Sequence, residues 1–344
     1  MKILIVKFGA LGDVVRTSYF AEALKVKYGS ELELSWITSI ISIPLLECNP
    51  YIDILTYDFN DLSYINFDII YSLDDELDVV ISVSKLFNKK IVGAKLTPNG
   101  PGYTDDSSLW FDMGLLSRLG KIEADKLKKI NRLGHAEIFK QIFNVHRVLP
   151  NFYTDNNKKD LLPSIFHNHD DFFIGINPYA GGRWPAKELG EYELKNLIHD
   201  LTTIFSKSNV NLKIVLLGAG EDKIRSQKVS EELKVELLYV ADTDKSIMYF
   251  AEFISKLNII ITSDSLAMHL AIAQGKPTLA FFAPTSAAEI DSFGICEKLI
   301  STAQDYCSYK KDCDNSSITS RRIIELLLSS SIFKYQLNNI GIEN

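Results

Sequence analysis

The chain has no surplus of basic residues and no long apolar segment. Its 344 residues carry a formal net charge of −7, which argues against general binding to the phosphates of nucleic acids. No apolar segment is long enough to cross a bilayer, and the N-terminal sequence MKILIVKFGA lacks the apolar core and cleavage site of a signal peptide. We therefore expect a cytoplasmic protein that makes at most peripheral contact with a membrane.

Cysteine is scarce as well. The four cysteines fit free thiols in a reducing compartment. Cys307 and Cys313 lie in the polar segment YCSYKKDCDN, with Cys296 upstream, and this spacing does not match the paired ligands of zinc sites. We expect plain thiols and no bound metal, with a cysteine metal site as the alternative. The sequence assigns no further role to Cys296, Cys307 or Cys313.

The chain also lacks the GxGxxG sequence that binds dinucleotides. Residues 2–6 form a strand-like run, and the loop FGALGD after it contains only Gly9 and Gly12. Apolar residues at helical spacing follow this loop. A Rossmann-like strand–loop–helix is therefore predicted at the N-terminus, with a ligand other than a dinucleotide.

Asp13 lies in the first turn of this expected helix. There the positive end of the helix dipole stabilises an ionised carboxylate. An acid at such a position often serves the helix alone, as a cap or a first-turn charge. Because Asp13 also follows a glycine-containing loop at the end of a strand, a general base is an equally good interpretation. The residues alone leave both interpretations open.

The chain is long for a single core and alternates between strand-like and helix-like segments. In the first half, strands are expected at 32–38, 52–58, 67–75 and 89–95 and a helix at 132–145. A long loop is expected at 96–114, in which Trp110 and Phe111 either fill the core or cover a sugar site. The polar stretch at 149–170 is predicted to be an interdomain linker.

The second half repeats the alternation. Strands are expected at 172–176, 212–218, 235–241, 257–262 and 277–283. Helices are expected at 192–207, 221–233, 246–255, 267–274 and 325–330. Such an order produces parallel sheets that are covered by helices on both faces. We therefore predict an α/β protein with two domains, residues 1–155 and 170–344.

Two segments of the second half follow strands and turn polar where parallel sheets bind ligands. In SDSLAMHLAIAQGKP, Ser263 or Asp264 is expected to cap a helix, so that its first amides face an anion. These amides belong to Ser265, Leu266 and Ala267. In NPYAGGRWPAK, Lys187 would add a mobile positive charge after a glycine pair. Together the two segments predict a phosphate site.

The same segments resemble a known family. FGALGDVVRTSYFAEALK resembles the N-terminal segment of glycosyltransferase family 9, the heptosyltransferases. NPYAGGRWPAK resembles the phosphate-binding segment of that family, and SDSLAMHLAIAQGKPTLAFFAPT resembles its C-terminal donor signature. The resemblance covers nearly the whole chain and implies a GT-B fold, in which two Rossmann-like domains face each other across a cleft. The N-terminal domain would bind the acceptor and the C-terminal domain the nucleotide-sugar.

The resemblance also implies an activity and a set of site residues. It implies an inverting, metal-independent transfer, without a cofactor, of heptose from ADP-heptose to a hydroxyl of the lipopolysaccharide core or another surface glycan. Asp13 matches the base of the family, and we place Gly12 and Arg16 on the acceptor side. The residues matched to the donor side are Lys187, Glu221 (with Asp222 adjoining it), Asp264, Ser265, Leu266, Ala267 and His269.

The chain departs from the family pattern in two places. Arg16 stands where the lipopolysaccharide enzymes often carry His, and no run of Lys and Arg is evident that would meet an anionic lipid-linked sugar. A protein hydroxyl or a small metabolite therefore remains an alternative acceptor. A sugar-nucleotide epimerase of the same fold and a nucleotide-binding module without catalysis are the rival functions.

Overall fold

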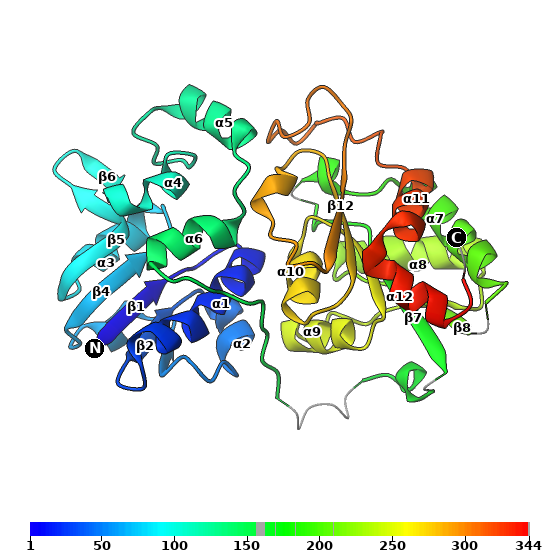
Figure 1. Ribbon diagram of the computed structural model, residues 1–344, viewed down its shortest axis with the longest axis horizontal. Helices are drawn as coiled ribbons and strands as arrows, with labels where there is room; N and C mark the ends of the chain where they lie inside the picture. Colours follow the sequence, from blue (N-terminus) through cyan, green and yellow to red (C-terminus); the bar gives the residue numbers. More distant parts are fainter. Residues whose placement is uncertain (156–161, 169, 183, 209, 343–344) are drawn as a thin grey trace. The chain divides into compact units, whose positions relative to one another are not determined.

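The computed structural model describes residues 1–155, 162–168, 170–182, 184–208 and 210–342. The chain forms two compact units (Figure 1). Unit 1 comprises Met1–Thr154 and Ala288–Asp291, and unit 2 comprises Asp155–Ala287 and Ser292–Asn344. Among the described residues, each unit contains one six-stranded sheet. Part of the expected linker, residues 156–161 and 169, lies outside the described residues.

Unit 1 has a parallel sheet with an antiparallel edge. Its strands are β1 (Lys2–Val6), β2 (Glu33–Ile37), β3 (Ile54–Thr56), β4 (Phe67–Ser72), β5 (Asn88–Thr97) and β6 (Gly100–Tyr103). They lie in the order β3-β2-β1-β4-β5-β6, with β6 antiparallel to β5. Its helices are α1 (Leu11–Tyr28), α2 (Ile43–Leu46), α3 (Leu77–Ser84), α4 (Ser108–Phe111), α5 (Lys121–Ile130) and α6 (His135–Phe143).

Helices cover both faces of this sheet because successive strand residues point to opposite sides. Leu4 of β1 belongs to a buried cluster with Val79 of α3. On the other face, Tyr71 of β4 packs against Phe143 of α6, with 4.4 Å between ring centroids. Phe143 in turn stacks on Phe20 of α1 at 4.7 Å.

Segment 96–114 corrects the prediction of a long loop. It contains β6 and α4, because Gly100, at a φ of 104°, allows a tight turn that Thr97 closes through a bond to the Gly100 carbonyl at 2.7 Å. Phe111 is buried in the core of unit 1, whereas Trp110 is only half-buried. Helix α5 was not predicted, because charged residues dominate its sequence, KIEADKLKKI.

Unit 2 has an entirely parallel sheet. Its strands are β7 (Asp171–Asn177), β8 (Asn211–Leu216), β9 (Leu238–Val240), β10 (Ile259–Ser263), β11 (Thr278–Phe282) and β12 (Cys296–Ile300), in the order β12-β11-β10-β7-β8-β9. Its helices are α7 (Glu191–Phe205), α8 (Glu221–Leu233), α9 (Ile247–Ser255), α10 (Leu266–Ala273), α11 (Ser320–Ser329) and α12 (Ser331–Asn339). Strand β12 was missed because its sequence, CEKLI, includes two charged residues.

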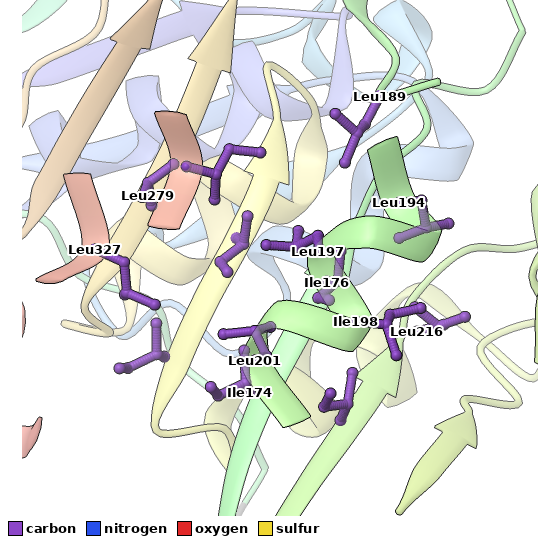
Figure 2. Close-up of a cluster of buried hydrophobic side chains, with 14 of the residues drawn as sticks. Ile174, Ile176, Leu189, Leu194, Leu197, Ile198, Leu201, Leu216, Leu279 and Leu327 are labelled. Atoms are coloured by element: carbon purple, nitrogen blue, oxygen red, sulfur yellow. The ribbon is translucent and has the colours of Figure 1, made fainter. Parts of the chain in front are cut away.

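The core of unit 2 lies between the sheet and α7. Figure 2 shows the apolar stripe of α7 against β7, with Leu197 and Leu201 close to Ile174 and Ile176. Leu327 of α11 belongs to the same buried cluster. Each such side chain contributes about 1.5 to 3 kcal/mol when it is fully buried. This packing fixes the carboxyl end of β7, from which the site described below begins.

The opposite face of the unit 2 sheet packs against aromatic residues. Phe173 of β7 contacts Phe166, and Phe166 contacts Phe253 of α9, each pair with 4.8 Å between ring centroids. Across the described ranges of both units, no helix combines the length and the apolar character needed to span a bilayer.

Candidate functional site

Both sheets reverse their strand order at a central strand. In unit 2, β7 pairs with β8 on one side and β10 on the other. In unit 1, β1 lies in the same way between β2 and β4. Connections leave such a strand in opposite directions, which opens a crevice outside the carboxyl ends where α/β proteins bind ligands. Polar residues gather at this position in each unit.

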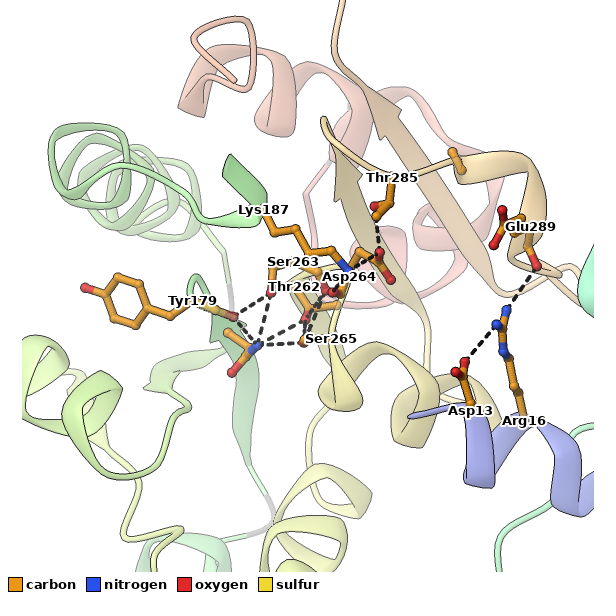
Figure 3. Close-up of polar contacts among 12 residues, drawn as sticks. Asp13, Arg16, Tyr179, Lys187, Thr262, Ser263, Asp264, Ser265, Thr285 and Glu289 are labelled. Carbon is orange, nitrogen blue, oxygen red and sulfur yellow. Dashed lines mark hydrogen bonds and ion pairs between the residues drawn. The ribbon is translucent and has the colours of Figure 1, made fainter. Parts of the chain in front are cut away.

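In unit 2, hydrogen bonds join the ends of β7 and β10. The amide of Asn177, the last residue of β7, donates to the Tyr179 carbonyl at 3.1 Å and to the Ser265 hydroxyl at 2.9 Å. Ser263, the last residue of β10, donates to the same carbonyl at 2.6 Å. Figure 3 shows these bonds converging beside the start of α10. They fix the first turn of that helix against the loop after β7.

Lys187 joins this cluster as half of an ion pair. Its ammonium lies 2.7 Å from the Asp264 carboxylate and 3.2 Å from the Asp264 carbonyl (Figure 3). The two side chains retain only 16% and 12% exposure. The expected mobile charge was therefore wrong, because Lys187 is fixed by a partner 77 residues away in the sequence. Within the described part of the chain, these bonds use two of its three N–H groups and leave one for a ligand.

Asp264 is held in its ionised form. Burial alone would raise the pKa of this carboxyl, but Lys187 and its other polar neighbours together outweigh burial, so the pKa lies below its ordinary value. His269, buried in α10, and Thr285, which donates a hydrogen bond at 2.7 Å, act in the same direction. Asp264, in the turn before α10, and Lys187, on the loop after β7, therefore place two opposite charges side by side in fixed positions.

The cap of helix α10 lies one to two residues later than its sequence suggested. Its cap is Ser265, not Ser263 or Asp264: Ser263 still belongs to β10, and the Asp264 side chain bonds to Lys187. The Ser265 side chain makes no capping bond to the helix. The first amides of α10, including those of Leu266 and Ala267, therefore have no side-chain cap, and such amides bind anions well.

The two acids at the start of α8 differ in their surroundings. Glu221 is exposed at the start of the helix. Asp222 accepts a bond from the Gly181 N–H at 3.0 Å, and burial raises its pKa. The structure thus links Asp222, and not Glu221, to the loop after β7.

Arg225 is a residue of this region that the sequence analysis missed. Its guanidinium lies 3.7 Å from the ring centroid of Tyr179 and donates to the Glu188 carboxylate at 2.8 Å. It also lies 3.4 Å from Asp222. Arg225 therefore ties α8 to both ends of the loop that carries Lys187. No sequence signal connects these residues, because they are up to 46 positions apart.

In unit 1 a buried ion pair lies at the carboxyl ends of β1 and β4. Lys7, directly after β1, lies 2.6 Å from Asp74, which follows β4, and both side chains are about one-tenth exposed. The backbone N–H of Phe8 also donates to Asp74. Asp74 thus holds the start of the loop that leads into α1.

Asp13 and Arg16 lie one turn apart at the start of α1, after the buried Gly12. Their charged groups are 2.7 Å apart, and the Asp13 side chain is 32% exposed. Arg16 also donates to the Glu289 carbonyl at 3.4 Å, and it lies 5.7 Å from the Trp110 ring centroid. The cap of α1 is Ala10, so Asp13 is not the cap residue. A partly exposed carboxylate beside an arginine can hold a hydroxyl group and accept its proton.

The buried Lys7–Asp74 pair gives a stability prediction. Asp74→Ala should lower the stability of unit 1 by about 3 kcal/mol, because Lys7 would stay buried without its partner. Hydrogen exchange in peptides from β1 and β4 measures this loss, and peptides from unit 2 are the internal control. The double variant Lys7→Met/Asp74→Leu should lose less stability than a variant with either single change. Equal protection from hydrogen exchange in Asp74→Ala and the wild type would contradict a stabilising role for the pair.

Among the described residues, the cysteines form no metal-binding group with the site residues. Cys296, Cys307 and Cys313 are buried thiols, and burial raises the pKa of Cys296 to about 12. Cys313 belongs to a small buried cluster with Ala186, the residue before Lys187. Among the described residues, no three His, Cys, Asp or Glu side chains lie close enough to hold a metal ion.

The fold and the two polar crevices define an α/β protein with two Rossmann-like units, the architecture of GT-B glycosyltransferases. The family model for glycosyltransferase family 9 (heptosyltransferase) matches residues 121–318. The chain therefore belongs to glycosyltransferase family 9 and is a heptosyltransferase-like glycosyltransferase.

Solved structures agree on the fold. The structure is similar to E. coli ADP-heptose lipopolysaccharide heptosyltransferase II, with 16% identity, a TM-score of 0.68, and coverage of 98% of this chain and 99% of that chain. A family 9 glycosyl transferase from Veillonella parvula is also similar, with 20% identity, a TM-score of 0.72, and coverage of 96% of this chain and 98% of that chain. The E. coli heptosyltransferase WaaC with ADP has 12% identity, a TM-score of 0.66, and coverage of 95% of this chain and 99% of that chain. No sequence among the curated proteins matches the chain.

Proposed function

We propose that this protein transfers a heptose from ADP-heptose to a hydroxyl acceptor in one inverting step, without a metal ion. Family membership supports the transfer reaction. The observation that carries the donor assignment is the Lys187–Asp264 pair beside the uncapped start of α10. ADP-heptose is the first donor to test, because the names of two similar structures include ADP or ADP-heptose.

The C-terminal domain, residues 170–344, binds the donor in this proposal. The amides of Leu266 and Ala267 and the remaining N–H of Lys187 contact the diphosphate, since fixed donors stabilise a leaving anion best. Asp264 keeps Lys187 in place, and His269 and Ser265 complete the wall of the site. Glu221 was assigned to the ribose, and the bonding of Asp222 makes Asp222 the better candidate for that contact.

The N-terminal domain, residues 1–155, binds the acceptor. Asp13 is the base, Arg16 orients its carboxylate at 2.7 Å, and Gly12 gives the acceptor close access to the backbone. The acceptor oxygen forms a bond to the anomeric carbon while the bond from that carbon to the diphosphate breaks. The hydroxyl proton passes to Asp13, and ADP leaves with its added negative charge on the phosphate. Attack from the side opposite the leaving group inverts the anomeric centre.

Metal independence gives a direct prediction. Because amides and a lysine take the place of a divalent cation at the diphosphate, turnover should be unchanged within about twofold in excess EDTA. Steady-state ADP release with and without the chelator measures this. Loss of activity that magnesium or manganese restores would contradict the proposal, and loss that only zinc or iron restores would indicate a cysteine metal site.

Two rival functions predict different products from the same incubation. A sugar-nucleotide epimerase would convert ADP-heptose without an acceptor, and a binding module would convert nothing. The proposed transferase should release ADP at a rate that rises at least tenfold with an acceptor. The assay is ADP release from ADP-heptose alone and with lipopolysaccharide core sugars, protein hydroxyls and small metabolites, read by mass spectrometry.

The acceptor class is the open part of the proposal. A lipopolysaccharide core or another surface glycan is the first candidate, and Arg16 favours a screen that also includes a protein hydroxyl and a small metabolite. The free thiols fit a cytoplasmic location for the reaction.

A further inference from the structure

Unit 1 exposes an unusual group of large apolar side chains around α5. Leu115 is 91% exposed in the segment before the helix, and Ile122 and Ile130 within it are 77% and 66% exposed. Leu119 and Leu133, at its two flanks, are also exposed. Figure 1 shows α5 at the edge of unit 1, away from the sheet of that unit. We call the five residues Leu115, Leu119, Ile122, Ile130 and Leu133 the α5 patch.

Helix geometry places the two isoleucines of α5 on its outward side. Ile122, Lys126 and Ile130 are spaced at i, i+4 and i+8, so they lie along one face of the helix. The opposite face carries Ala124, which is buried, and Leu127, which is half-buried. The helix therefore packs through Ala124 and Leu127 and presents two isoleucines away from the core of its own unit.

The charge around these side chains is basic, in contrast to the rest of the chain. The formal net charge of the protein is −7, yet residues 121–132 contain five Lys or Arg and only two acidic residues. Both acids form exposed pairs inside the helix, Glu123 with Lys126 and Asp125 with Lys121. Residues 126–136 contain four basic side chains and no acid. The sequence analysis missed this positive surface because its basic residues are interrupted.

We propose that the α5 patch docks unit 1 onto an anionic lipid surface. Protein interfaces are depleted in Lys and enriched in aromatic side chains, whereas the α5 patch has no aromatic residue and lies among lysines. Isoleucine and leucine side chains enter the acyl boundary, and neighbouring lysines reach the headgroup phosphates with their long stems. Peripheral docking of this kind brings the acceptor-side unit to a membrane that carries a lipid-linked acceptor.

Vesicle co-sedimentation of the full chain tests the proposal without any transfer reaction. Wild-type protein should bind vesicles of phosphatidylcholine with 30 mol% phosphatidylglycerol at least tenfold better than phosphatidylcholine alone, and added salt should weaken this binding. Leu115→Ser/Ile122→Ser/Ile130→Ser and Lys126→Ser/Lys129→Ser should each reduce it at least tenfold. The matched control is Ile224→Ser/Tyr335→Ser, which removes two exposed apolar side chains from unit 2 and should bind like the wild type.

Three outcomes would overturn the proposal. The first is the absence of wild-type binding to anionic vesicles, and the second is equal binding by the patch variants and the control. The third is a concentration-dependent dimer in light scattering that the triple variant converts to a monomer, which would assign the α5 patch to self-association. Circular dichroism of each variant shows that it is folded, and unchanged ADP release from ADP-heptose with a soluble acceptor shows that the active site is intact.

Discussion

Asp13→Asn is expected to reduce turnover by about two to four orders of magnitude, the usual contribution of a general base. Asparagine keeps the size of the side chain and can still bond to Arg16, but it cannot accept the acceptor proton. Folding should change little, because the cap of α1 is Ala10 and a first-turn acid contributes only about 0.3 to 1 kcal/mol. Affinity for ADP should remain at the wild-type value, because ADP binds in unit 2 in our proposal.

The matched control is Glu22→Gln on the same helix, whose side chain bonds to Tyr51 and Asn151. It removes an acid from α1 without touching the loop after β1, so its turnover should stay within about threefold of the wild type. ADP release with acceptor and titration with ADP, measured on both variants, separate catalysis from donor binding. Near-normal turnover of Asp13→Asn would remove the base assignment and leave Asp13 as a first-turn charge.

Lys187→Met is expected to weaken ADP binding by about ten- to a hundredfold, the value of one charge-assisted hydrogen bond to the diphosphate. It should also destabilise unit 2 by about 3 kcal/mol, because Asp264 would stay buried without its partner. Asp264→Leu should lower the stability of unit 2 by a similar amount, because Lys187 would then stay buried without its partner. The double change Lys187→Met/Asp264→Leu should recover much of the stability without recovering ADP affinity.

Calorimetric titration with ADP and hydrogen exchange in β10 peptides separate these two effects. If Lys187 contacts the diphosphate, ADP affinity follows the presence of Lys187 and not the stability of the unit. Wild-type ADP affinity in the folded double variant would show that the pair is structural only. Lys195→Met is a suitable control, because Lys195 of α7 forms surface ion pairs with Glu191 of the same helix and Glu232 of α8.

The sequence was sufficient for the periodic part of the fold. Helices with an apolar stripe, such as α7 and α9, begin and end within two residues of the expected positions, because burial decides both the pattern and the structure. Strand β12 and helix α5 lack such a pattern, since charged residues occupy much of each element. The position of β12 depends on its pairing with β11, and α5 lies at the surface. A pattern of neighbouring residues in the sequence contains neither kind of information.

The sequence was sufficient to propose where the candidate site lies, but not to predict which of its side chains contact each other. The rule that ligands bind at strand ends placed Lys187, Asp264 and Asp13 in the two crevices. The pairing of Lys187 with Asp264 and the contact of Arg225 with Tyr179 depend on side chains 77 and 46 positions apart. The cap of α10 moved to Ser265 because Asp264 is committed to that pair, a choice that helix-capping preferences alone do not predict.

The anomeric configuration of the product tests the central claim most directly. Wild-type protein is incubated with ADP-heptose, excess EDTA and the acceptor that stimulates ADP release, and the isolated product is examined by NMR. Our account predicts an acceptor that has gained one heptose and whose anomeric centre is inverted relative to the donor. A product that retains the donor configuration, or ADP release without a heptosylated product, would contradict a single displacement with Asp13 as the base.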